Sequence, residues 1–187
     1  GTTITAQITA FNISAYAPLI YLADDTQLFV DECFLDLSDS GESLKQYLAT
    51  FKNLFILKAF TKSYGMAGIR LGYCLCADGK LLSRMAAASQ PWNVSSLAQA
   101  AGVAALQEQA FLQKTKDLVA VEREWLKREL EALGFRVIPS SVNYLLFQAK
   151  PDLHTKLKAK KIAIRNCDNY FGLGPGWYRI AVRLHEE

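Results

Sequence analysis

The chain has 187 residues, of which 51% are hydrophobic and 21% charged, and its formal net charge is +3 with a pI near 8.6. No apolar run approaches the roughly 18 residues of a membrane span, so the sequence predicts a soluble, globular protein of one or two domains. The mild charge does not favour nucleic-acid binding, since the only dense basic run is short and is expected on a solvated helix face: Lys156, Lys158, Lys160 and Lys161.

Short apolar strands and helical patterns alternate through the first half of the sequence. The first twenty residues carry no charge, and we expect a loosely specified helix there. Alternation of this kind is typical of βαβ units and a largely parallel sheet. The elements expected after this segment are a strand at 27–31, a helix at about 41–50, strands at 53–58 and 71–76, and a helix at about 79–89.

From Ser95 the pattern changes to a long helical stretch, as one helix or two, which Gly134 ends. We expect this stretch to link two domains, 1–118 and 119–187. The second domain is predicted to be a small α+β unit with a glycine-rich loop at 172–176. Its expected elements are strands at 135–138 and 143–147, a helix at 151–160, and strands at 162–165 and 177–182.

The cysteines and histidines do not indicate a metal site. Four cysteines, at positions 33, 74, 76 and 167, lack CxxC spacing and lie mostly in apolar strands. This is typical of reduced core thiols, so we expect no disulfide and no zinc. No charged-then-apolar leader opens the sequence, which favours a cytoplasmic location. His154 and His185 are interpreted as surface residues without a chemical role.

Two reactive residues follow apolar strands. Asp31 ends the stretch that begins at Leu28, and Lys62 comes shortly after the stretch 54–57. A pyridoxal phosphate (PLP) enzyme needs a lysine amine to hold the cofactor aldehyde as a Schiff base, and a carboxylate to keep the ring nitrogen protonated. Open α/β sheets bind ligands at the carboxyl ends of their strands. The two residues therefore indicate PLP as cofactor.

Each of these residues also has an ordinary structural interpretation. A lone lysine after a strand is more often a solvated turn residue, and an aspartate at a strand end can simply cap a helix. Three glycines close to the lysine favour the functional interpretation, because Gly65, Gly68 and Gly72 would be costly in a regular element. We expect them to serve positive φ or close backbone approach.

The run 59–73 resembles the lysine signature of the fold-type I, PLP-dependent aminotransferases. In that signature a hydroxyl residue precedes the lysine and Gly-x-Arg-apolar-Gly follows it, as Thr61, Lys62 and Arg70 do here with their glycines. The resemblance implies that Lys62 is the Schiff-base lysine, that Thr61 contacts the cofactor, and that Arg70 binds its phosphate through paired charged hydrogen bonds. One departure is Ala59, where the family has serine or glycine; alanine offers the phosphate no hydroxyl.

The last third resembles the same family more narrowly. Arg179 occupies the place of the arginine that binds the substrate carboxylate, and Arg165 matches an earlier arginine that binds phosphate in relatives acting on phosphorylated amino compounds. Across 164–183 the chain is more similar to threonine-phosphate decarboxylases than to histidinol-phosphate aminotransferases. Asn143 and Tyr64 are further candidates for lining the substrate pocket. Strand arginines are also often solvated edge residues or salt-bridge partners, and Asn143 and Tyr64 can be purely structural.

Phe34 departs from most aminotransferases, which have a tyrosine three residues after the aspartate. Phenylalanine has no hydroxyl for the cofactor oxygen O3′, and loss of such a bond costs roughly 1.5–3 kcal/mol and raises the Schiff-base pKa. The decarboxylase resemblance implies that Phe34 contacts the cofactor and alters the reaction outcome. The alternative is that Phe34 simply packs in the core.

The resemblance implies an α/β protein with a partial fold-type I architecture: a parallel-sheet remnant of the PLP-binding large domain at 1–118, and a small α+β domain at 119–187 without its last helix. It covers the second half of the family's length, so we expect this segment alone to be inactive. The whole enzyme is expected to be a cytoplasmic homodimer acting on a small amino-acid phosphate.

Three functions remain open from the sequence. The first is L-threonine-O-3-phosphate decarboxylase of the cobalamin pathway, and the second is an aminotransferase of the histidinol-phosphate type. Which Cα bond stands perpendicular to the cofactor ring decides between loss of CO2 and loss of the proton. The third is a ligand-binding module with the PLP fold but without turnover.

Overall fold

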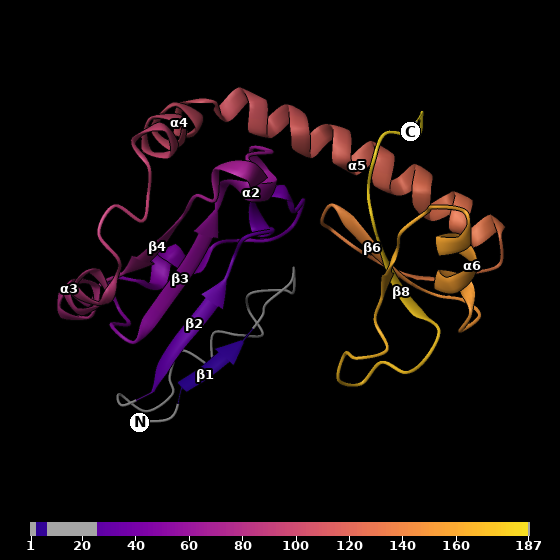
Figure 1. Cartoon of the computed structure of the whole chain (residues 1–187), viewed down its shortest axis with the longest axis horizontal. Coiled ribbons are helices and arrows are strands. Elements are labelled where there is room, and N and C mark those ends of the chain that lie inside the picture. Colours follow the sequence, from indigo (N-terminus) through magenta and orange to yellow (C-terminus); the bar gives the residue numbers. More distant parts are fainter. Residues whose placement is uncertain (1–2, 7–25, 187) are drawn as a thin grey trace. The chain divides into compact units, whose positions relative to one another are not determined.

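The computed structural model describes residues 3–6 and 26–186 (Figure 1). The chain divides into two compact units, Gly1–Thr115 and Lys116–Glu187. The expected mixed α/β composition is confirmed, since both units contain a four-stranded sheet and helices.

The sheet of the first unit has the order β1-β2-β3-β4. The first three strands are parallel, as expected, but β4 runs antiparallel to β3. An antiparallel return needs no crossover helix, and the connection from β3 to β4 contains only short helical turns. The strands are β1 (Thr3–Ala6), β2 (Gln27–Asp31), β3 (Leu54–Ala59) and β4 (Gly72–Cys76).

Two predictions for the first unit were wrong. Residues 3–6 form a strand and not part of a helix, in keeping with their β-branched threonines and isoleucine; the rest of that predicted helix, 7–20, lies outside the described residues. At 41–50 only the 3-10 turn Leu44–Tyr47 forms, capped by the hydroxyl of Ser43. Leu44 is the one buried residue of that turn, so no apolar stripe supports a longer helix.

The longer helices agree with expectation. Asp78 caps α3 by accepting hydrogen bonds from the backbone N–H groups of Lys80 and Leu81, and Ser95 caps α4 in the same way. The stretch after Ser95 forms two helices, α4 and α5. The helices of the first unit and the linking stretch are α2 (Phe60–Ser63), α3 (Gly79–Ala88), α4 (Ser96–Gln107) and α5 (Gln109–Ala132), with 3-10 turns at Leu35–Leu37 and Ala67–Ile69.

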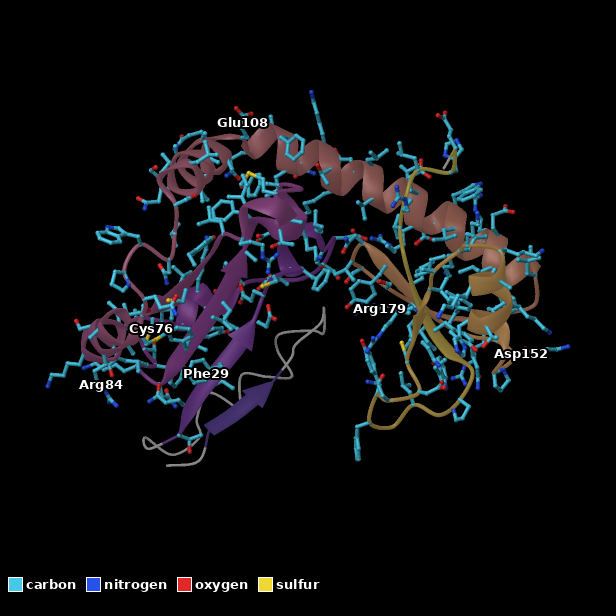
Figure 2. All side chains as sticks on the ribbon, in the orientation of Figure 1. Phe29, Cys76, Arg84, Glu108, Asp152 and Arg179 are labelled. Atoms are coloured by element: carbon cyan, nitrogen blue, oxygen red, sulfur yellow. The ribbon has the colours of Figure 1, made fainter. Side chains whose placement is uncertain are left out.

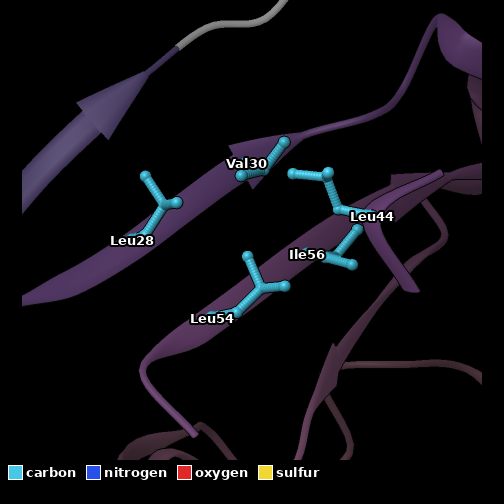
Figure 3. Packing of buried hydrophobic residues seen from close by; sticks show 5 residues of the cluster. All are labelled: Leu28, Val30, Leu44, Leu54 and Ile56. Carbon is cyan, nitrogen blue, oxygen red and sulfur yellow. The ribbon is translucent and has the colours of Figure 1, made fainter. Parts of the chain in front are cut away.

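One face of β2 and β3 carries the core of the first unit. Strand side chains alternate between faces, so every second residue lies on this side. On this face of β3, Lys58 follows Leu54 and Ile56, and it is also buried, at 8% exposure. A charged side chain therefore continues the apolar row, and it needs partners there. The core cluster consists of Leu28, Val30, Leu44, Leu54 and Ile56 (Figure 3).

The second unit is an antiparallel sheet of order β5-β6-β8-β7 with α6 and the end of α5. The strand predicted at 162–165 begins later and is short. The rings of Phe147 and Tyr178 lie 5.8 Å apart in the core, which also contains Leu130 and Leu145. The elements are β5 (Arg136–Ile138), β6 (Tyr144–Gln148), α6 (Leu153–Ala159), β7 (Arg165–Asn166) and β8 (Trp177–Ala181).

None of the helices in the described part of the chain is long and apolar enough to cross a membrane. The cysteines at 33, 74, 76 and 167 are free thiols. Within residues 3–6 and 26–186, no group of three or more His, Cys, Asp or Glu side chains is arranged to hold a metal ion.

Candidate active site

Asp31 lies at the carboxyl end of β2, where it pairs in register with Leu57 of the parallel strand β3. The aspartate is half-buried, and its Oδ1 accepts a 2.9 Å hydrogen bond from the backbone N–H of Cys33. Burial, followed by a side-chain hydrogen bond with Asp31 and the charge of Asp31, raises the pKa of the Cys33 thiol to about 12. Cys33 is therefore a neutral thiol next to the side chain of Asp31.

Lys62 lies in α2, directly after β3, and therefore at the same edge of the sheet as Asp31. Its amine is exposed and forms no ion pair with any residue that the structure describes. The amine nitrogen lies 5.8 Å from the centre of the Phe34 ring, so the structure brings these two sequence-predicted residues together. Thr61 is half-buried in the same turn.

Tyr64 belongs to an aromatic cluster beside the lysine turn. Its ring centre is 5.5 Å from that of Phe60 and 6.5 Å, in a stacked arrangement, from that of Phe111. Burial, followed by the charge of Asp36, raises the pKa of the Tyr64 hydroxyl above its ordinary value. Tyr64 thus remains a neutral phenol that contributes packing to the wall next to Lys62.

Arg70 ends the 3-10 turn Ala67–Ile69 in the left-handed conformation, with φ 58° and ψ 41°. This conformation is unusual for a residue with a side chain and is often found at functional sites. The guanidinium is exposed, and its Nη1 donates a 3.1 Å hydrogen bond to the carbonyl oxygen of Ala67. Among the residues that the structure describes, no other group accepts a hydrogen bond from this guanidinium, so its remaining donors can bind an anion.

The three glycines of the lysine signature differ in what they do. Gly65 has φ +65°, and a Cβ at Gly72 would lie 2.8 Å from the backbone oxygen of Lys58. Both fit the expectation from the sequence. Gly68 does not, because its φ is not in the left-handed region and a Cβ there would meet nothing within 4 Å.

This difference makes a testable pair of variants. Gly72→Ala is expected to lower the free energy of unfolding by about 1–3 kcal/mol, since β3 and β4 must separate to admit the methyl group. Gly68→Ala is expected to be neutral or to stabilise by about 0.4–1 kcal/mol, by restricting the unfolded chain. Urea unfolding of both variants checks this, and equal effects would contradict it.

A buried ion cluster, which sequence reasoning missed, lies behind the lysine turn. The Lys58 amine is 2.5 Å from Asp36 Oδ1 and 3.3 Å from Glu32 Oε2. Glu32 is 4% exposed and also accepts hydrogen bonds of 2.8 Å from the Ser43 hydroxyl and the Leu44 backbone N–H. The available signal was the alternation of the strands, which puts Lys58 on the core side.

The surroundings of Lys58 raise the pKa of its amine overall. Burial lowers it, but the hydrogen bond and charge of Asp36 and the charge of Glu32 outweigh burial and leave it above 10.5. A lysine whose folded-state pKa is raised contributes stability that is present in full below pH about 10.5 and is lost as the pH rises through the folded-state value.

Lys58→Met is therefore expected to cost about 3–5 kcal/mol at pH 7, because it leaves the buried Glu32 and the partly buried Asp36 without their cation. The deficit relative to wild type should shrink as the pH rises from 10.5 toward the raised folded-state pKa, at which the wild-type lysine also loses its proton. Urea unfolding between pH 7 and 11.5 measures both, with the exposed Lys52→Met as control. A deficit that stays constant to the highest pH would contradict this account.

In the second unit, Arg165 of β7 and Arg179 of β8 are direct cross-strand partners. Each guanidinium stacks on an aromatic ring, Arg165 on Tyr170 at 5.6 Å and Arg179 on Tyr144 at 5.0 Å. Arg179 is labelled on β8 in Figure 2. Like charges directly opposite each other destabilise a sheet, so this pair is suited to an anion that neutralises it.

Asn143 lies just before β6, next to the Tyr144 ring that supports Arg179. Its backbone oxygen accepts a 2.9 Å hydrogen bond from the N–H of Val182. Its side-chain oxygen is buried and has no hydrogen-bond partner among the described residues. A buried acceptor of this kind is costly unless a ligand or water supplies a donor.

The two histidines differ from the sequence interpretation in detail. His154 is half-buried with its ring 6.1 Å from that of Tyr178, so it is not a simple surface residue. The His185 side chain is 54% exposed, but its Nδ1 lies 2.9 Å from Oε1 of the buried Glu122. These contacts attach α6 and the C-terminal segment to the second unit.

The first unit thus presents an exposed lysine amine, a carboxylate at the same sheet edge and an arginine with available donors, which together fit PLP. Comparison with known proteins agrees. Residues 9–187 match the family model of aminotransferase class I and II. The chain belongs to this family of PLP-dependent enzymes.

Two curated relatives are similar over most of this chain. Threonine-phosphate decarboxylase of Salmonella typhimurium is 34% identical over 160 residues, which cover 83% of this chain and 44% of that protein. Histidinol-phosphate aminotransferase 3 of Rhizobium meliloti is 35% identical over 137 residues, covering 70% of this chain and 36% of that protein. The chain therefore spans less than half the length of these relatives.

Solved structures share the fold. The histidinol-phosphate aminotransferase from Clostridium acetobutylicum superposes with a TM-score of 0.90 at 24% identity, covering 98% of this chain and 60% of that chain. Histidinol-phosphate aminotransferase from Sinorhizobium meliloti, in complex with pyridoxal-5'-phosphate, gives a TM-score of 0.81 at 21% identity. The superposition covers 96% of this chain and 52% of that chain. The predicted partial fold-type I architecture is confirmed.

Proposed function

We propose that the whole natural protein that contains this sequence is a PLP-dependent enzyme that acts on a phosphorylated amino acid. L-threonine-O-3-phosphate decarboxylase is the first candidate. The observation that carries the substrate class is the cross-strand pair of Arg165 and Arg179, two guanidiniums on one face of a sheet in register. The cofactor part of the proposal is supported by Asp31 and Lys62 at one sheet edge.

The chain's own residues have distinct roles toward the cofactor. When bound, PLP supplies an electron sink for cleavage of a bond at the substrate Cα. Asp31 would hold the proton on the ring nitrogen, and Arg70 and Thr61 would bind the phosphate end. The exposed amine of Lys62 would attach the cofactor and, once displaced, accept or return a proton.

The second unit would bind the two anionic groups of the substrate. Arg179 would hold the carboxylate and Arg165 the phosphate, each through paired charged hydrogen bonds. Their aromatic supports, Tyr144 and Tyr170, limit the guanidinium orientations and so reduce the entropy lost on binding. The buried oxygen of Asn143 would accept a hydrogen bond from a substrate donor.

Two alternatives remain. An aminotransferase of the histidinol-phosphate type is supported by relatives of similar identity, such as the Rhizobium meliloti protein. Phe34 favours the decarboxylase, because it offers no hydroxyl to the cofactor and resembles the decarboxylase group at this position. A ligand-binding module without turnover is the third candidate. The proposal includes a homodimer, which light scattering tests.

The experiment combines trapping with product analysis. The protein is incubated with PLP and borohydride and digested with trypsin; cofactor on the peptide 59–70 supports Lys62, and an unmodified peptide contradicts it. The protein is then given PLP and threonine phosphate, with an amino acceptor in a parallel sample. Release of CO2 alone supports the decarboxylase. Acceptor-dependent formation of the corresponding 2-oxo acid from threonine phosphate, or of the corresponding ketone from histidinol phosphate, supports the aminotransferase. Cofactor binding without either product supports the module.

A further inference from the structure

The turn α2, which carries Lys62, is too short to fix its own position. It has four residues, and its backbone hydrogen bond from Tyr64 to the oxygen of Phe60 is 3.3 Å long, beyond the usual range. Ala59, at the N-cap, provides no side-chain hydrogen bond. A single helical turn is unstable without tertiary contacts. The place of the lysine must therefore be set from outside the turn.

Two buried side chains of the turn make these outside contacts. Phe60, 4% exposed, packs its ring 5.6 Å from that of Tyr73, a contact that is not directional. Ser63, 1% exposed, donates a 3.2 Å hydrogen bond from its hydroxyl to Asp36 Oδ2. This bond is directional, so it fixes the rotation of the turn as well as its depth.

Through Asp36, the turn is connected to the buried ion cluster of Glu32, Lys58 and Asp36. The members of this cluster are sequence neighbours of the candidate cofactor-binding residues. Glu32 follows Asp31, Asp36 comes two residues after Phe34, and Ser63 follows Lys62. Three candidate residues therefore have a member of this network next to them or two residues away in the chain. Glu32 and Asp36 contact Lys58 directly, and Ser63 is connected to it through Asp36.

Burying charged side chains such as Lys58 and Glu32 is an unfavourable way to gain stability alone, because apolar side chains of similar volume stabilise at least as well. What an ion cluster adds is a single, directional arrangement. We propose that Glu32, Lys58, Asp36 and Ser63 form a positioning device that fixes the Lys62 turn relative to the segment 31–34. The role of Lys62 in this inference rests on the proposed function, whereas the way in which its turn is held rests on the contacts alone.

The charges of the cluster also reach the titratable groups around the turn. Burial raises the pKa of Tyr73. To a smaller extent, the charge of Lys58 lowers this pKa and the charge of Asp36 raises it. Asp36 also contributes, after burial, to the raised pKa of Tyr64. Cys33, beside Asp31, lies within reach of the same charges. Removing one charge of the cluster therefore changes the electrostatic environment on both sides of Lys62.

The first test needs no cofactor. Ser63→Ala removes the hydrogen bond to the cluster, and Asp36→Asn removes one charge while keeping the shape. In the whole natural protein, both variants are expected to speed amide hydrogen exchange at 64–66 about tenfold, without changing exchange in β6. Ser83→Ala, a helical serine, and Glu42→Gln, an exposed carboxylate, serve as controls. Exchange that matches the controls in both variants overturns the proposal.

The second test separates positioning from simple stability. The pH midpoint of the absorbance of bound PLP should fall by about half a unit to one unit in Asp36→Asn, because a nearby negative charge is lost. Ser63→Ala should keep the midpoint but lower kcat about tenfold at unchanged KM. If midpoint and kcat stay at wild-type values while only the urea midpoint falls, the cluster is merely structural. If borohydride leaves no PLP label on peptide 59–70 of the wild-type protein, the proposed function fails. The hydrogen-exchange result still decides whether the cluster positions the Lys62 turn.

Discussion

Lys62→Ala is expected to abolish borohydride labelling of the peptide 59–70 and to lower turnover by on the order of 10³–10⁴-fold. The amine is exposed at the carboxyl edge of the sheet, and its nitrogen lies 5.8 Å from the centre of the Phe34 ring. An exposed contact of this type is worth about 0.5–1 kcal/mol, so the variant should fold with nearly unchanged stability. Turnover, labelling and urea unfolding measure the three effects.

Lys52→Ala is the matched control, because Lys52 is also exposed and precedes the same strand. It should leave labelling and turnover at wild-type levels. A Lys62→Ala protein that kept half of the wild-type turnover would show that another amine does the chemistry. Lys58 cannot replace it, since its amine is held between two carboxylates in the core.

The strands that position the site followed from the sequence because their signal is local. Uninterrupted apolar runs before Asp31 and before Lys62 define β2 and β3, and parallel pairing places both residues at one edge. Capping residues likewise marked α3 and α4, since Asp78 and Ser95 bond to the first turns of these helices. These features need no knowledge of distant contacts.

The features that were missed depend on pairing between distant segments. The direction of β4 follows from the short connection through Arg70, and the strand at 3–6 pairs with β2, more than twenty residues later in the chain. The ion cluster needed the register of β2 against β3 before Glu32 and Lys58 could be placed on one face. Alternation alone indicated a buried lysine, but its partners, Glu32 and Asp36, come from a segment at least 22 residues earlier in the chain.

Arg165→Ala is expected to change substrate selectivity more than any other substitution in the second unit. Loss of two charged hydrogen bonds to a phosphate costs about 2–4 kcal/mol, or roughly 30–1000-fold in kcat/KM. The loss should be confined to phosphorylated substrates, and threonine itself should react as poorly as with wild type. Arg179→Ala should instead lower kcat/KM for both, because the carboxylate is common to them.

Arg136→Ala provides the control, since this arginine stacks on Trp177 at 5.6 Å in the same sheet, as Arg165 stacks on Tyr170. It should leave selectivity unchanged. The cross-strand repulsion adds an independent signature: without substrate, Arg165→Ala should not lower the urea midpoint, because a like-charge pair disappears with the lost stacking. Equal losses with threonine and threonine phosphate would instead remove Arg165 from phosphate recognition, in the decarboxylase and in the histidinol-phosphate aminotransferase alternative alike.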